Sequence, residues 1–153
     1  MRALMILLVS LGFVAAVQAA DAVTGRIVKV LPLFLDQQGR DATSPSLFDR
    51  DAYQAWLREH TNQISALRFD VLWKATKSPG EKVKIALELR GMGTNSEPKL
   101  KTLETNVVPG TFRTWTEIPL AGADFREFGA VVAWRVTLWH GGKQLGEHKS
   151  FLW

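Results

Sequence analysis

The sequence predicts an all-β domain: a seven-stranded antiparallel β-sandwich with one inserted α-helix. Two observations predict this class. Several segments alternate apolar and polar side chains, which is the pattern of half-buried strands, and turn residues such as Gly141-Gly142 separate them roughly every 10 to 20 residues. One segment, at about 47–60, instead has the period of a helix. Short alternating strands with turn signals favour a sandwich over a parallel sheet.

The first residues predict an export signal. Arg2 is followed by an apolar run that ends at Val17, and Ala19 provides a small residue for cleavage, so residues 1–19 are expected to be a signal peptide. A retained membrane anchor is the alternative, but the run is shorter than the roughly 20 residues that cross a bilayer. We therefore expect an exported protein, in the periplasm or outside the cell.

Composition limits what the remaining segment, residues 20–153, can be. It has the length of a single domain. The chain has no cysteine, which excludes disulfides, thiol chemistry and cysteine-ligated metals. Its 19 basic and 15 acidic residues are interspersed rather than clustered, so no nucleic-acid partner is expected. No later segment is long and apolar enough to span a membrane after processing.

The first strand is expected at 24–35, and Pro32 makes it an edge strand or one that bends there, because proline lacks the ladder donor. Residues 36–39 form a turn, and Ser46 is a helix N-cap before the helix at 47–60. One helical stripe is apolar and aromatic: Tyr53, Trp56, Leu57 and His60. We expect Trp56 to pack against the sandwich and so anchor this helix.

The remaining strands follow from alternation, with a single helical turn between the fifth and the sixth, at 124–128. The strands are expected at 67–74, 83–90, 100–105, 112–118, 130–139 and 145–153. Trp73 and Trp134 are assigned to the core. Val132 shares the Trp134 side of its strand.

The register of the last hairpin has two solutions. A two- or four-residue loop would place Glu147 and Lys149 beside Trp134, whereas a three-residue loop with a glycine bulge would place Gly146 and His148 there. The second is preferred, because it avoids burying charged side chains against apolar neighbours. His148 would then be half-buried and hydrogen-bonded.

Over about residues 24–153, the strand count and the two inward tryptophans resemble an immunoglobulin-like or fibronectin-type sandwich. The chain has no cysteine pair and no tyrosine corner, which departs from the immunoglobulin family proper. Four stretches are similar to a type of uncharacterised bacterial exported protein with no known activity: LPLFLDQQGR, SPSLFDRDAYQAWLREH, LRFDVLWKA and AWRVTLW.

Residues that could carry chemistry are few. The three histidines lack the spacing of a zinc site, so no metal or other cofactor is predicted. Asp49 and Asp51 lie in the first helical turn, where negative charge is stabilising. With His60 they are the least implausible acids and base of an alternative function, a small envelope hydrolase with its site between the helix and loop 91–98.

Six tryptophans are many for a chain of this length. In the preferred register, Trp139 and Trp153 lie opposite Trp134 and, with Phe151, could form an exposed aromatic strip, to which Trp115 is a further candidate. The expected function is a non-catalytic binding or assembly module for an envelope protein or a polysaccharide. Alternatively, the inserted helix or the Pro32 segment covers the strip.

Overall fold

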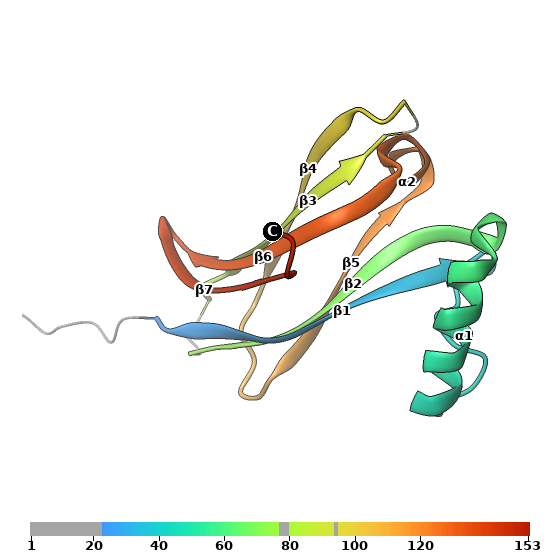
Figure 1. Cartoon of the computed structure of the whole chain (residues 1–153). Helices are drawn as coiled ribbons and strands as arrows, with labels where there is room; N and C mark the ends of the chain where they lie inside the picture. The colour runs from blue at the N-terminus through green and yellow to red at the C-terminus, as the bar shows by residue number, and fades with distance from the viewer. Residues whose placement is uncertain (1–22, 77–79, 94) are drawn as a thin grey trace, which may run out of the picture.

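The computed structural model describes residues 23–76, 80–93 and 95–153, and the predicted signal peptide lies outside them. Two antiparallel sheets pack face to face, which confirms the immunoglobulin-like sandwich (Figure 1). One sheet has the order β1-β2-β5 and the other the order β4-β3-β6-β7. The strands are β1 (Gly25–Asp36), β2 (Ile64–Ala75), β3 (Val83–Met92), β4 (Pro98–Val107), β5 (Thr114–Ala121), β6 (Ala130–His140) and β7 (Lys143–Lys149).

The core lies between the two sheets, where alternate side chains of both meet. Trp73 is 1% exposed, and its indole N–H donates to the Thr116 hydroxyl at 2.8 Å, so its assignment to the core is confirmed. Trp134 points inward as predicted but is only partly buried, with its ring centre 6.0 Å from that of Phe69. The other fully buried large side chains include Val71, Val83, Ile85, Leu87, Leu89, Leu120, Val136 and Leu138.

Strand β1 lies at the edge of its sheet, which is one of the two positions that Pro32 predicted. Its pairing with β2 continues past Pro32 without a shift in register there. The two irregularities in its pairing fall instead between Ile27 and Lys29 and between Leu35 and Asp36. Near its start β1 is approached by β7, where a Cβ on Gly146 would lie 3.0 Å from the Arg26 Cα. The absence of a side chain at position 146 therefore lets the two sheets come close on this side.

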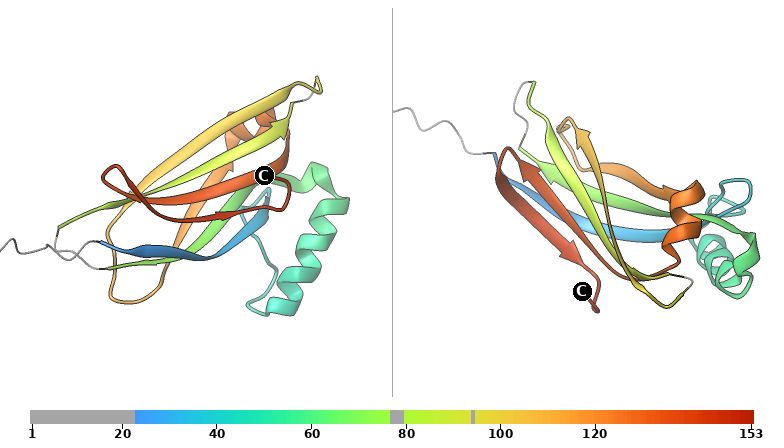
Figure 2. Two further views of the ribbon diagram at one scale, coloured as in Figure 1. Left: turned by 60° about the vertical axis from the view of Figure 1, so that its left-hand side comes forward. Right: turned by 90° about the horizontal axis from the view of Figure 1, so that it is seen from above.

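The inserted helix, α1 (Leu47–Glu59), ends one residue before the predicted boundary, and the Ser46 side chain accepts from the Asp49 N–H as an N-cap. It does not lie flat on a sheet but projects from the end of β1 (Figures 1 and 2). The expectation that Trp56 anchors the helix is wrong: Trp56 is 40% exposed and stacks between Tyr53 and His60. The buried residues of α1 are Gln54 and Leu57.

The assignment of Val132 to the inner side of its strand is wrong. The pairing of β3 with β6 slips by one residue between Arg90 and Gly91, which leaves Val132 opposite no partner and 48% exposed. An inserted residue of this kind is a β-bulge, and it changes which face of the sheet the next side chains point to. Trp134, Val136 and Leu138 therefore face inward, whereas Val132 does not.

The preferred three-residue loop of the last hairpin is wrong, but the facing that it predicted is correct. His140 pairs with Lys143, so the turn has two residues, and a bulge at Leu145 then reverses the facing. As preferred, His148 lies on the Trp134 side, with the ring centres 5.7 Å apart. The expectation that His148 is half-buried is wrong, because it is exposed on an edge strand. Strand β7 ends at Lys149, and the chain closes with a turn instead of continuing as a strand to residue 153.

A second helix, α2 (Gly122–Phe128), replaces the predicted single helical turn. Phe128 is 4% exposed and belongs to the core, and its ring occupies the space that a side chain at Gly91 would need. Gly129 ends α2 with a φ of 78°, a conformation that favours glycine. Both helices lie at the same end of the sandwich, with the short 3₁₀ helix η1 (Thr61–Gln63) following α1 (Figure 2).

Candidate functional site

Helix α1 is attached to the edge of β1 through a buried amide. Gln54 is 3% exposed; its carbonyl oxygen accepts from the Phe34 N–H at 2.8 Å, and its NH₂ donates to the backbone carbonyls of Phe34 and Asp41, both at 2.9 Å. The side chain thus supplies the donor and acceptor that a further strand would give to this edge. At Phe34, the free backbone groups of β1 therefore hydrogen-bond to a helix side chain instead of another strand.

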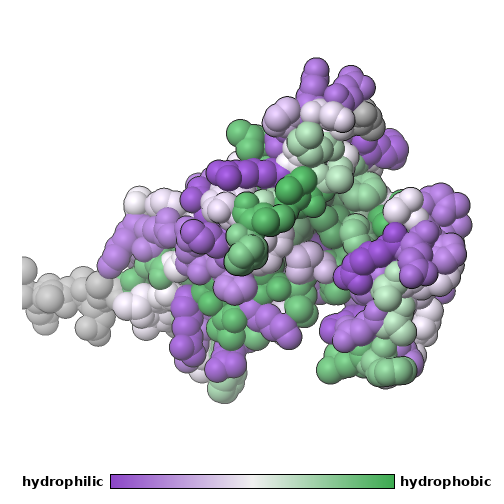
Figure 3. All heavy atoms as spheres, in the orientation of Figure 1, coloured by the Kyte–Doolittle hydropathy of each residue, from purple (hydrophilic) through white to green (hydrophobic). Residues whose placement is uncertain are grey.

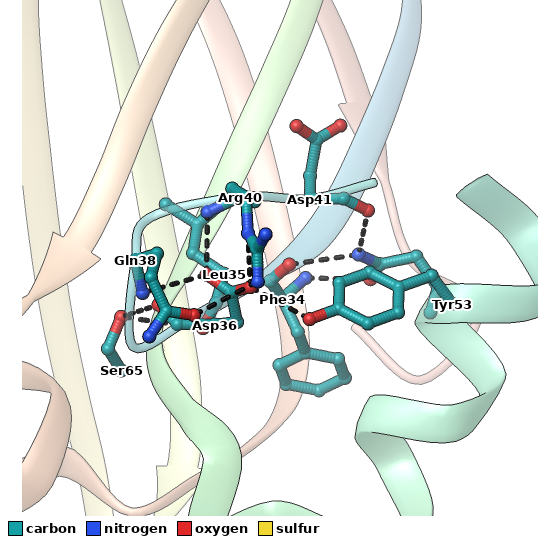
Figure 4. Close-up of polar contacts among 9 residues, drawn as sticks. Phe34, Leu35, Asp36, Gln38, Arg40, Asp41, Tyr53 and Ser65 are labelled. Carbon is teal, nitrogen blue, oxygen red and sulfur yellow. Dashed lines mark hydrogen bonds and ion pairs between the residues drawn. The ribbon is translucent and has the colours of Figure 1, made fainter. Parts of the chain in front are cut away.

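A second attachment centres on Asp36, which is 2% exposed (Figure 4). Its carboxylate accepts from the Gln38 N–H, the Arg40 N–H, the Arg40 guanidinium and the Tyr53 hydroxyl at 2.8–2.9 Å. Burial acts to raise the pKa of Asp36, but these hydrogen bonds outweigh it and lower the pKa to about 2. The bond to Asp36, together with burial, raises the pKa of Tyr53. The cluster therefore holds a charged Asp36 and a neutral Tyr53 at neutral pH.

An apolar pocket of about 340 Å³, the end pocket, lies at the end of the sandwich that carries both helices. Its walls come from β1, β2, α2 and β6, and its polar groups are Arg58 of α1 and Thr61 of η1. The guanidinium carbon of Arg58 lies 5.9 Å from the centre of the Phe34 ring. The lining residues are Phe34, Arg58, Thr61, Ile64, Leu67, Phe125, Gly129, Ala130 and Val131.

Two of the predicted aromatic residues lie on the outer face of the four-stranded sheet. Trp139 pairs with Lys84 on that face, and its indole N–H donates to the Thr137 hydroxyl at 2.8 Å. Trp153 folds back over the same face, with the guanidinium carbons of Arg90 and Arg135 4.0 and 4.8 Å from its ring centre. Both rings are partly buried rather than fully exposed.

The other two predicted aromatic residues are exposed but lie apart. Phe151 is completely exposed in the terminal turn, beside Leu152 at 66% exposure. Trp115 is 48% exposed, but it pairs with Leu72 on β5 and β2, in the opposite sheet, so it does not join the strip. Helix α1 and Pro32 also belong to the β1 side, so they do not cover Trp153. Figure 3 shows hydrophobic atoms gathered where Figure 1 marks the C terminus.

The residues of the alternative hydrolase site have separate local partners. Asp49 accepts from the Ser44 hydroxyl at 2.5 Å, and Asp51 lies 3.3 Å from Arg50. The His60 ring nitrogen lies 2.9 Å from the Trp56 carbonyl oxygen. Among the described residues, no hydrogen bond or ion pair joins any two of the three. Nor does that part of the chain contain a cluster of three or more His, Cys, Asp or Glu side chains that could hold a metal ion.

Sequence reasoning missed Gln54, Asp36 and Arg58. Asp36 was assigned only to a turn, since nothing local shows that a turn carboxylate is buried. A signal for Gln54 was present: it lies three residues before Leu57 and so shares the helix face that Leu57 buries. A polar residue on a buried stripe indicates a specific hydrogen-bond partner, which here is the edge of β1.

Comparison with known proteins identifies the fold alone. No family model matches the chain, and no protein of curated function does. A protein of known structure from Akkermansia muciniphila superposes with a TM-score of 0.56 at 13% identity, over 84% of this chain and 71% of that one. No helix in the described part of the chain is long and apolar enough to cross a membrane. The chain is therefore similar to a bacterial β-sandwich protein.

Proposed function

We propose that this protein is an exported binding module that docks a partner protein through its terminal patch, defined as Leu100, Phe151, Leu152 and Trp153. The observation that carries the proposal is the exposure of three of these side chains: 80% for Leu100, 101% for Phe151 and 66% for Leu152. Leu100 and Trp153 line one shallow depression of about 200 Å³, and the other two precede Trp153 in the chain. Apolar side chains that gather on a surface in this way are typical of interaction sites.

The chemistry of the terminal patch favours a protein over a polysaccharide. Two of its four residues are leucines, which offer no flat ring on which a sugar can stack. The indole of Trp153 lies against Arg90 and Arg135, and tryptophan and arginine are the residues most enriched in the energetic centre of protein interfaces. Glu88, which pairs with Arg135, adds a charged rim.

The predicted signal peptide supports a partner in the cell envelope. Residues 1–19 combine a positive start, an apolar run and a small residue at the expected cleavage point. Expression of the full chain should yield a secreted product that begins at Ala20, whereas a chain without residues 2–19 should stay in the cytoplasm. Mass spectrometry of the product decides this, and a retained leader would contradict export by cleavage.

Site-specific crosslinking in intact cells tests the docking surface. A photo-reactive amino acid replaces Phe151 in one variant and Phe112 in the control, because Phe112 is similarly exposed at 82% but lies between β4 and β5. We expect one dominant protein adduct from position 151 and none of the same mass from position 112. Equal adducts at both positions, no protein adduct at 151, or a polysaccharide adduct there would contradict the proposal.

A further inference from the structure

We infer that the end pocket binds a small amphiphile, a carboxylate with a hydrocarbon tail of about eight to ten carbons. This site is separate from the terminal patch, and the inference does not depend on the proposed docking function. It rests on three features of the described residues: an apolar cavity of ligand size, a single arginine among the residues that line it, and a rigid attachment of the helix that carries this arginine.

The walls of the end pocket suit a hydrocarbon. Phe34 and Leu67 are paired across β1 and β2, and Phe125 of α2 and Val131 of β6 complete the apolar wall. The volume of about 340 Å³ falls in the range of roughly 300–1,000 Å³ that is usual for small-ligand sites. It corresponds to on the order of ten groups the size of a water molecule, which sets the length of the tail.

Arg58 provides the charge that a carboxylate needs. Among the described residues, no carboxylate lies within ion-pair distance of its guanidinium, and none of the lining residues is acidic. Because the guanidinium carbon lies 5.9 Å from the centre of the Phe34 ring, the positive charge stands at the apolar wall. A planar guanidinium can bond a carboxylate through two parallel N–H groups, and the neighbouring Thr61 hydroxyl can donate a third bond.

The fold fixes the helical turn that carries Arg58 before any ligand binds, although the side chain itself is exposed. Arg58 follows Gln54 by four residues, one turn of α1, and Gln54 ties this helix to the Phe34 backbone. Tyr53 adds its bond to Asp36 on β1. The pocket wall and its cation are therefore linked through the same strand, and preorganisation of this kind lowers the entropic cost of binding.

Calorimetric titration of the purified protein with decanoate, below its micelle concentration, tests this inference. We expect saturable binding at one site. Decanol, which lacks the charge, should bind at least about tenfold more weakly. Arg58→Gln should weaken decanoate binding to a similar extent, whereas Arg126→Gln, the same change at an exposed arginine of α2 that does not line the pocket, should leave it unchanged.

A second variant fills the pocket without removing the charge. Ala130 lines the end pocket but is itself exposed, so Ala130→Phe can occupy the cavity with little cost to folding, which circular dichroism and thermal melting would verify. Decanoate binding should be lost in this variant. The inference is wrong if the wild-type chain shows no saturable binding, if decanol binds as tightly as decanoate, or if binding survives both Arg58→Gln and Ala130→Phe.

Discussion

The two helices lie at the same end of the sandwich, but a different kind of interaction dominates the attachment of each. Helix α2 is attached mainly through apolar packing, with Phe128 in the core and Phe125 against it. Two lysines of β4 add polar contacts, Lys101 with the Asp124 carboxylate and Lys99 with the Glu127 carbonyl. Helix α1 buries one leucine and is held to β1 mainly by hydrogen bonds through Gln54 and Tyr53, with the Arg58 guanidinium near the Phe34 ring. At this end of the fold, one helix is therefore stabilised mainly by hydrophobic burial and the other mainly by hydrogen bonds to the backbone and side chains of a strand edge.

The difference follows from what each helix covers. Helix α2 follows β5 directly and closes the end of the gap between the sheets, where apolar side chains need cover from water. Helix α1 meets the free edge of β1, where backbone N–H and C=O groups need partners more than apolar contact. The surface that a helix meets thus decides which of its side chains become buried.

Phe128→Ala should have the largest effect on this comparison. Truncating a buried phenylalanine leaves a cavity in the core, and we expect the free energy of unfolding to fall by about 3–5 kcal/mol. Urea denaturation followed by tryptophan fluorescence measures it. Phe112→Ala is the matched control, since that ring is 82% exposed, and it should change stability by less than about 0.5 kcal/mol. Equal effects would remove Phe128 from the core.

Asp36→Asn should have the next largest effect, a loss of about 2–3 kcal/mol at pH 7, because hydrogen bonds to a charged carboxylate become weaker ones to an amide. The folded-state pKa of Asp36, about 2, lies below its ordinary value of 3.8. Its contribution is therefore fully present above about pH 4 and is lost as the pH falls through about 2. The stability difference between wild type and Asp36→Asn should shrink over that window, and a constant difference would contradict the role of the charge.

Gln54→Met tests the attachment of α1 through its amide. Methionine preserves the length and helix propensity of the side chain but leaves the Phe34 N–H and C=O without their partner. We expect a loss of about 1–2 kcal/mol. Hydrogen exchange should also become faster at the Phe34 amide than at Val71, in the central strand β2. Unchanged exchange at Phe34 would mean that Gln54 does not protect the edge of β1.

Trp56→Ala should have the smallest effect, although the sequence singles out this residue as the anchor of α1. The ring is 40% exposed and, among the described residues, stacks only on its helical neighbours Tyr53 and His60, so we expect a loss of no more than about 1 kcal/mol. Thermal melting of the two variants compares Trp56 with Gln54 directly. A larger loss for Trp56→Ala would reverse the proposed basis of α1 attachment.

The sequence by itself determined features that depend on near neighbours in the chain. Alternation identified the inward side of β2, including Trp73, because successive side chains on a strand point to opposite faces. The N-cap at Ser46 also followed, and Pro32 limited its strand to an edge or a bend, of which the structure shows the edge, since both depend on local backbone chemistry. Even the facing of His148 was predicted correctly, because burying Glu147 and Lys149 would be costly.

The tertiary structure alone decided which residues meet across long separations. A single extra residue, at Val132 or Leu145, changes which side chains face inward, and no local pattern marks it. Burial of Gln54 instead of Trp56 depends on the free edge of β1, and burial of Asp36 depends on Tyr53, seventeen residues away. The end pocket likewise exists only where four separate elements meet. Alternation reports which face is buried, but the partner on that face is set by packing of the whole chain.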